Sequence, residues 1–193
     1  ALGHPVILDP VGAGASKFRT ETTFRLMKEI QFAVIRGNIS EIKTVYSGSG
    51  STKGVDADVT DTVTDDNLAD TAEFAKELSK TTGAIIAITG AIDVIADAEH
   101  AYATRNGVAD MSKITGTGCM LDGVIAGYVA ANMENPTNAV VAAIAAEGLC
   151  GEIAGEKVQA EGSGTSSLRM YLIDAMSRLD GETLVHGAKV EEI

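Results

Sequence analysis

Three short apolar runs alternate with stretches of helical periodicity in the first half of the chain. The runs are Val6–Leu8, Ala33–Ile35 and Ala84–Ile88. Short apolar runs bounded by turn residues are typical of buried strands, and apolar residues recurring every three or four positions are typical of amphipathic helices. The alternation predicts an α/β fold with a mostly parallel sheet and helices on both faces, a three-layer arrangement.

The rest of the chain is expected to be mostly helical. Asp93–Ala96 and Ala101–Thr104 flank a polar turn and predict an antiparallel pair of strands. The expected helices cover 20–31, 38–48, 68–78, 120–129, 137–158 and 166–178, and a polar tail follows them. A chain of 193 residues fits one domain, so a single domain over 1–193 is expected.

Polar residues follow the strand-like runs. Asp9 ends the first run, Arg36 the second and Thr89 the third, and Glu41 stands three residues after Asn38 with the spacing of a helix-capping pair. Loops at the carboxyl ends of parallel strands build ligand sites. Each residue also has a purely structural explanation, as an ion pair, a turn cap or a capping partner. Their shared edge nevertheless favours a phosphoryl-transfer site, which needs an arginine for charge and carboxylates for magnesium.

The stretch Ile114–Cys119 places two glycines and a cysteine directly before an apolar helix. A helix start presents unpaired N–H groups and the positive end of the helix dipole, which together favour an anion and a thiolate. The same pattern fits a tight turn followed by a small buried cysteine. Cys119 is therefore a candidate base beside a candidate phosphate site, whereas Cys150, inside an alanine-rich stretch, is assigned to packing.

Composition excludes several classes of protein. The net charge of −12 argues against binding to nucleic acid, which depends on a lysine- and arginine-rich surface. We expect no membrane span and no signal peptide at the N-terminus. Two widely separated cysteines without ligand spacing predict neither a zinc site nor a disulfide framework, which indicates a cytoplasmic protein.

Taken together, the motifs resemble the hydroxyethylthiazole kinase family of ribokinase-like enzymes. The resemblance extends over nearly the whole chain. It is carried by Val6–Ala15, by Ile35–Ile42 with its Arg-Gly-Asn-x-x-Glu pattern, by Gly54-Val55-Asp56, by Ile88-Thr89-Gly90 and by Thr115–Cys119. It implies transfer of the ATP γ-phosphoryl group to the primary alcohol of 4-methyl-5-(2-hydroxyethyl)thiazole, in thiamine biosynthesis or salvage.

The resemblance also implies a role for each candidate residue. Cys119 would be the catalytic base, in the place where most ribokinase-like enzymes carry an aspartate. Arg36 and Thr89 would contact the nucleotide phosphates, and Gly116 would lie against the thiazole alcohol. Asp9 and Glu41 would hold or orient Mg²⁺. The family is trimeric, so a homotrimer is expected.

Family members carry an additional N-terminal stretch with early sheet strands, and this chain is expected to lack those strands. Three alternatives stay open. A hydroxymethylpyrimidine phosphate kinase uses a similar Gly-x-Gly-Cys turn, a hydrate dehydratase of the same fold has Asp where Cys119 stands, and a fragment could bind nucleotide without catalysing transfer. The Arg-Gly-Asn-x-x-Glu pattern favours the thiazole enzyme.

Overall fold

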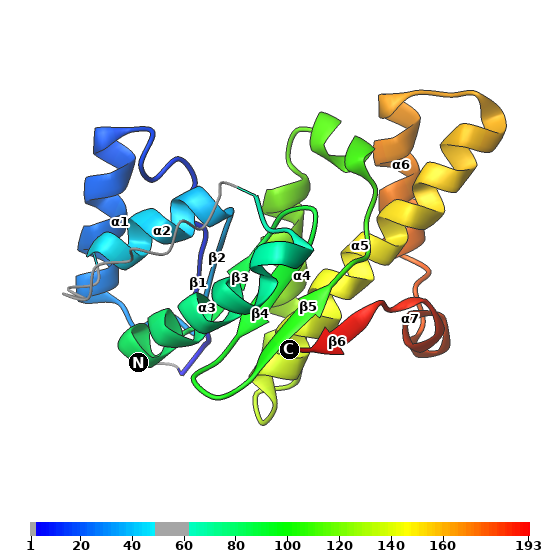
Figure 1. The fold of residues 1–193 in the computed structure, drawn as a ribbon. Helices are drawn as coiled ribbons and strands as arrows, with labels where there is room; N and C mark the ends of the chain where they lie inside the picture. The colour runs from blue at the N-terminus through cyan, green and yellow to red at the C-terminus, as the bar shows by residue number, and fades with distance from the viewer. Residues whose placement is uncertain (1–2, 49–61) are drawn as a thin grey trace. The chain divides into compact units, whose positions relative to one another are not determined.

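The computed structural model describes residues 3–48 and 62–193, which form two compact units (Figure 1). Unit 1 consists of the chain up to Ala103 together with Glu192 and Ile193, and unit 2 consists of Thr104–Glu191. The motif Gly54-Val55-Asp56 lies outside the described residues.

The sheet of unit 1 begins with three parallel strands. β1 (Ile7–Leu8) pairs with β2 (Val34–Gly37), and β2 pairs with β3 (Ile85–Ile88). β4 (Asp93–Ala96) is antiparallel to β3, and a short turn closed by the bond from Asp97 N to His100 O leads to β5 (Ala101–Thr104). All four residues of β3 are buried, as its continuous apolar run predicts.

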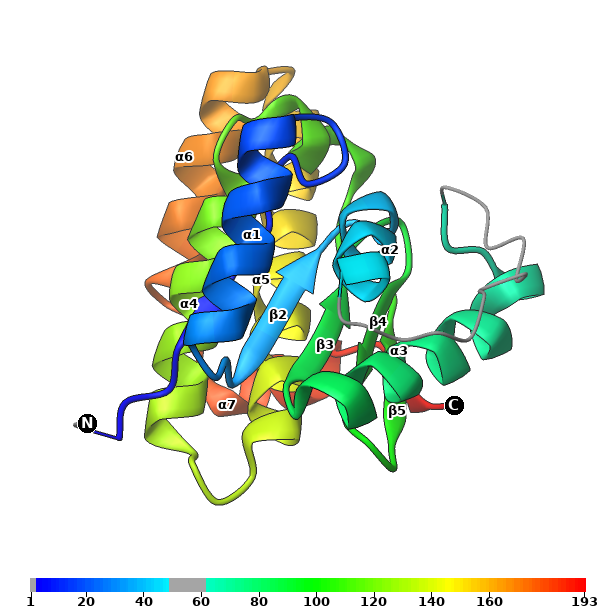
Figure 2. The ribbon, with the colours of Figure 1, turned by 90° about the vertical axis from the view of Figure 1, so that its left-hand side faces the viewer.

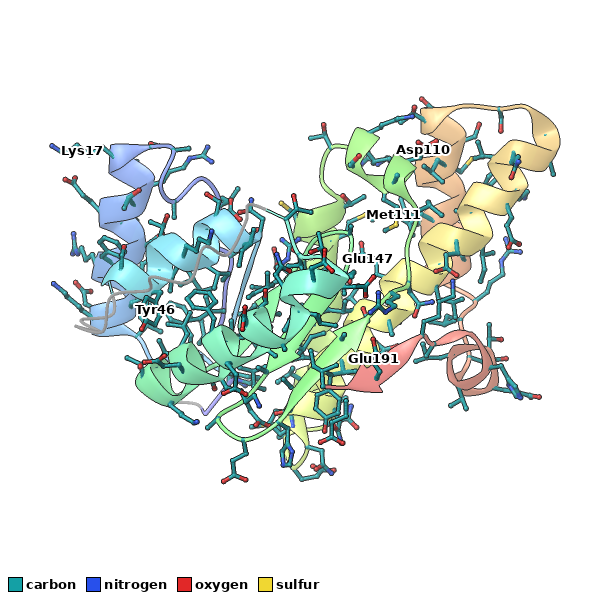
Figure 3. The ribbon with its side chains drawn as sticks, in the orientation of Figure 1. Lys17, Tyr46, Asp110, Met111, Glu147 and Glu191 are labelled. Atoms are coloured by element: carbon teal, nitrogen blue, oxygen red, sulfur yellow. The ribbon has the colours of Figure 1, made fainter. Side chains whose placement is uncertain are left out.

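Helices join the parallel strands and pack on this sheet. They are α1 (Lys17–Glu29), α2 (Ile39–Gly48) and α3 (Leu68–Thr82), the last preceded by a short 3₁₀ helix, η1 (Asp65–Asn67). Figure 2 shows α2 near β2 and α3 alongside β3 and β4. The rings of Tyr46 and Phe74 pack 5.2 Å apart in the core between α2 and α3 (Figure 3).

The helix boundaries follow capping groups more closely than hydrophobic periodicity. The periodicity predicts a first helix over 20–31, but α1 begins at Lys17 because the hydroxyl of Ser16 accepts a hydrogen bond from the Arg19 N–H. The helix ends at Glu29, which leaves the side chain of Gln31 to donate to the carbonyl oxygen of Thr82 at the end of α3.

Unit 2 is mostly helical. It contains the 3₁₀ helix η2 (Ala109–Lys113), α4 (Thr117–Ala131), α5 (Pro136–Glu161), α6 (Thr165–Met176) and α7 (Gly181–Gly187). α5 packs against both α4 and α6. Among the described helices, α5 alone has the length and apolar composition of a membrane span, and 72% of that apolar window is buried. Burial to this degree also fits a core helix.

The tail after α6 is more structured than its polar sequence predicts. It contains α7, whose first turn is capped by the Asp180 carboxylate accepting from the Thr183 N–H, and the strand β6 (Val190–Glu192). In unit 2 Arg105 N donates to Lys189 O, and in unit 1 Ile193 N donates to Ala101 O. The expected polar tail thus contains a helix and a strand that its sequence does not predict, because backbone pairing needs no apolar pattern.

The predicted α/β class is confirmed, and the sheet is mixed. β1 to β3 are parallel, whereas the strand that follows β3 runs antiparallel. The antiparallel pair expected at 93–104 corresponds to β4 and β5. The expectation of a single domain over 1–193 stays a prediction.

Candidate active site

In unit 1, Asp9 and Arg36 lie at the carboxyl ends of neighbouring parallel strands, β1 and β2. The Asp9 Oδ2 and Arg36 Nη1 atoms are 3.5 Å apart, and the two side chains are only 18% and 13% exposed. An ion pair shielded from water to this degree is less screened than a pair on the open surface. The sequence prediction that these two residues share one sheet edge is met in the structure.

Glu41 connects the loops that follow β1 and β2. Its Oε1 accepts a hydrogen bond from Gly12 N at 2.8 Å, and its Oε2 accepts one from Asn38 N at 3.0 Å. The Asn38 side chain in turn accepts from Glu41 N at 2.9 Å, so the predicted capping pair forms. The carboxylate therefore holds together the loop that begins at Asp9 and the turn that follows Arg36 and β2.

Thr89 follows β3 and lies beside the end of β2. Its backbone N–H donates to Gly37 O at 2.9 Å, and its hydroxyl lies 3.4 Å from the same oxygen. Asp9, Arg36 and Thr89 therefore occupy the ends of three adjacent parallel strands, as the position of each residue after an apolar run predicts. Glu41 links the loops that follow the first two of these strands, β1 and β2.

In unit 2, Gly116 forms the turn at which α4 begins. Its φ is +100°, a left-handed conformation that favours glycine, and no side chain of the described residues caps this helix end. The first intrahelical bond runs from Met120 N to Gly116 O, so the N–H groups of Thr117, Gly118 and Cys119 precede the regular ladder. The helix starts earlier than the predicted position near Met120.

The two cysteines have different surroundings. Cys119 is exposed in the first turn of α4, whereas Cys150 is fully buried in α5. Burial raises the pKa of the Cys150 thiol from 9.0 to about 11, and the charge of Glu147 acts in the same direction. Cys150 is thus confirmed as a packing residue, and Cys119 has the exposure that a base requires.

The described residues contain no cluster of three or more histidine, cysteine, aspartate or glutamate side chains able to hold a metal alone. Mg²⁺ in phosphoryl-transfer enzymes commonly takes only one or two carboxylates and completes its shell with phosphate and water. Each Glu41 oxygen accepts one hydrogen bond and keeps a second lone pair. Asp9 and Glu41 each offer carboxylate oxygens, the type of ligand that Mg²⁺ prefers.

Unit 2 also contains a polar cluster that the sequence did not predict, formed by Asn106, Glu152 and Lys189. Glu152 Oε1 accepts from Gly107 N at 2.8 Å and from Asn106 Nδ2 at 3.2 Å, while its Oε2 lies 2.9 Å from Lys189 Nζ. The sequence does contain a signal, since Glu152 is an acidic residue flanked by Gly151 and Gly155 in a largely apolar helix. Glu152 and Lys189 also line a cavity of about 730 Å³ between residues 107–110 and α5.

Comparison with known proteins now identifies the family. A model of the hydroxyethylthiazole kinase family matches residues 1–182. The chain belongs to that family. It is 55% identical over 190 residues to the hydroxyethylthiazole kinase of Clostridium acetobutylicum, covering 98% of this chain and 69% of the relative. It is 39% identical to the hydroxyethylthiazole kinase of Methanobrevibacter smithii, covering 98% of this chain and 68% of that protein.

A solved structure of the hydroxyethylthiazole kinase protein from Pyrococcus horikoshii superposes with a TM-score of 0.83 at 28% identity. The match covers all of this chain and 66% of the solved one. The chain therefore spans about two thirds of the length of the relatives it matches. The resemblance to hydroxyethylthiazole kinases is confirmed, and with it the prediction of a kinase of the thiazole type. The roles of the individual site residues stay predictions.

Proposed function

We propose that this chain carries the phosphoryl-transfer machinery of a hydroxyethylthiazole kinase, which moves the γ-phosphoryl group of ATP to the primary alcohol of hydroxyethylthiazole. The observation that supports it most directly is the exposed Cys119 in the first turn of α4, directly after the left-handed Gly116. Membership of the kinase family supports the use of ATP.

In this proposal Cys119 is the base. The alcohol oxygen forms a bond to the γ-phosphorus, the bond from that phosphorus to the bridging oxygen of ADP breaks, and the Cys119 thiolate takes the hydroxyl proton. The N–H groups at the start of α4 stabilise negative charge on the transferring group. Gly116 lies against the thiazole alcohol, where the absence of a side chain lets the substrate approach the backbone.

Residues of unit 1 bind the nucleotide. Arg36 contacts the phosphates with its guanidinium, whose planar geometry suits phosphate oxygens, and Thr89 adds a hydroxyl contact. Asp9 and Glu41 would hold Mg²⁺, which when bound would offset the charge of the phosphates. The ion pair between Asp9 and Arg36 keeps the arginine oriented before nucleotide arrives.

The proposal extends to the assembly and location of the enzyme. A homotrimer is implied by the resemblance, and analytical ultracentrifugation of the full-length enzyme tests it. Two free cysteines agree with a reducing compartment and hence with the cytoplasm.

Replacement of the base tests the proposal. In the full-length enzyme, Cys119→Ala is expected to lower kcat about 10²- to 10⁴-fold, the usual contribution of a positioned base, with ATP binding retained. Cys119→Asp should keep measurable activity, and Cys150→Ala is the matched control. A wild-type kcat in Cys119→Ala would exclude the thiol as base.

The acceptor is tested separately. Hydroxyethylthiazole and hydroxymethylpyrimidine phosphate are compared as substrates of the same enzyme preparation, and a higher kcat/KM is expected for the thiazole. A preference for the pyrimidine would assign the rival kinase activity. ATP binding without transfer to either alcohol would indicate a non-catalytic nucleotide-binding protein.

A further inference from the structure

Residues 106–115, the segment that leads into the Gly116 turn, follow one face of α5. Gly148, Gly151 and Gly155 are spaced three and four residues apart, so they lie on the same face of that helix. A Cβ atom at Gly148 would be 2.6 Å from the backbone oxygen of Asn106, and one at Gly151 would overlap the sulfur of Met111. Figure 3 labels Met111, the residue of η2 that faces Gly151. The glycines let the segment lie directly on the helix.

Glu152 adds a polar anchor to this contact. It accepts hydrogen bonds from Gly107 N and Asn106 Nδ2 and pairs with Lys189 Nζ. Asn106 itself donates to Gly187 O at 2.9 Å and accepts from Lys189 N at 2.8 Å. One carboxylate on α5 therefore fixes the beginning of the segment and also the chain that precedes β6.

The ionised form of Glu152 is favoured by these contacts. Burial alone would raise its pKa, but the hydrogen bonds from Lys189, Gly107 and Asn106 and the charge of Lys189 outweigh burial and lower the pKa below its ordinary value. A charged carboxylate accepts stronger hydrogen bonds than a neutral one. Glu152 is therefore ionised at neutral pH and accepts these hydrogen bonds as a carboxylate.

The segment transmits this anchoring to the turn over a short length of chain. Met111 N donates to Val108 O and Ile114 N donates to Met111 O, so η2 forms a compact link. Ile114 is 6% exposed and packs with Cys150 and Leu168. Only Thr115 separates Ile114 from Gly116, so a shift of residues 106–107 would be passed on to the turn.

We propose that Glu152 is a positioning residue for the Gly116–Cys119 turn, acting through the segment that it ties to α5. The catalytic part of this inference rests on the proposed kinase function, in which Cys119 is the base. A displacement of about 1 Å at a reacting group can lower a rate about 10²-fold, so a loosened segment affects turnover more than binding.

Two measurements on the full-length enzyme test the inference. The first is the kcat and KM of Glu152→Ala with hydroxyethylthiazole and ATP, where kcat is expected to fall about 10-fold or more and each KM to change less than about twofold. The second is the rate at which iodoacetamide alkylates Cys119, followed by peptide mapping. That rate is expected to change at least about threefold, because the access of the reagent to the Cys119 sulfur depends on the geometry of the turn.

Matched variants separate positioning from general destabilisation. Glu152→Gln keeps an oxygen that can accept from Gly107 N and should restore kcat to within about threefold of wild type. Glu156→Ala removes an exposed carboxylate that lines the same cavity and, over the described residues, has no hydrogen bond to the segment, so it should behave as wild type. Cys150 is fully buried and reports unfolding, since it should stay unreactive in every folded variant.

The outcomes are decisive in either direction. Wild-type kcat and wild-type Cys119 alkylation in a folded Glu152→Ala would overturn the inference. If Cys150 becomes reactive in Glu152→Ala, that variant is unfolded, and Lys189→Ala is used to test the inference in its place. The Lys189 side chain is 55% exposed, and its loss should still lower kcat and shift Cys119 alkylation by about twofold; no change would overturn the inference. If the wild-type enzyme does not phosphorylate hydroxyethylthiazole, the proposed function fails, while the alkylation measurement still tests the positioning role.

Discussion

The carboxylate of Glu41 accepts a hydrogen bond from the backbone N–H of Gly12, which lies 29 residues earlier in the chain, at 2.8 Å. Its other oxygen caps the start of α2 through Asn38 N. One side chain therefore connects two loops that the sheet already brings to the same edge.

Glu41→Ala is expected to lower the free energy of unfolding by about 1–3 kcal/mol, because the N–H groups of Gly12 and Asn38 lose their acceptor. Glu41→Gln keeps one acceptor oxygen and should recover part of the loss. Urea unfolding of both variants provides the measurement. Equal stability of Glu41→Ala and wild type would show that water replaces the carboxylate at no cost.

Arg36→Ala is expected to lower kcat/KM for ATP about 10- to 100-fold, since charge-assisted hydrogen bonds to phosphate are among the stronger polar contacts. Arg36→Lys keeps the charge and loses the planar fork, so its loss should be smaller. Steady-state kinetics with ATP varied measures both effects, and the KM for hydroxyethylthiazole serves as the internal control. An unchanged kcat/KM for ATP would remove Arg36 from the nucleotide site.

The buried thiol of Cys150 is expected to lower the free energy of unfolding at alkaline pH. Its pKa is raised from 9.0 to about 11 in the folded chain, so between these values the unfolded state releases the thiol proton while the folded state keeps it. Stability is therefore unaffected by this group below pH 9 and falls as pH rises toward 11, by roughly 2–3 kcal/mol. Cys150→Ala should show a shallower fall. Denaturant unfolding at stepped pH compares the two slopes, and parallel slopes would contradict the assignment.

Gly116→Ala is expected to destabilise the chain by about 1–2 kcal/mol through backbone strain, because φ at this position is +100°. A Cβ atom there would meet nothing within 4 Å, so steric overlap does not contribute. Gly123→Ala, inside α4 and also with open space beside it, is the matched control and should stabilise by about 0.5–1 kcal/mol. Thermal unfolding of the two variants measures whether each substitution raises or lowers stability. A stabilising Gly116→Ala would rule out backbone strain at this position.

Much of unit 1 follows from local pattern. The run Ala84–Ile88 and the pair Asn38 and Glu41 predict β3 and the start of α2, because burial and capping depend on residues close in sequence. The positions of Asp9, Arg36 and Thr89 after apolar runs predict their place at one sheet edge. The family motifs identify the chain as a member of the hydroxyethylthiazole kinase family.

Other features depend on contacts between distant parts of the chain. The sequence could not decide whether Cys119 is exposed or buried, because a cysteine fits either environment. Nor did the sequence predict the hydrogen bond of Glu152 to Gly107, 45 residues earlier, or the strand β6. Periodicity records which face of an element is apolar, whereas a hydrogen bond between remote residues exists only once the tertiary structure brings its donor and acceptor together.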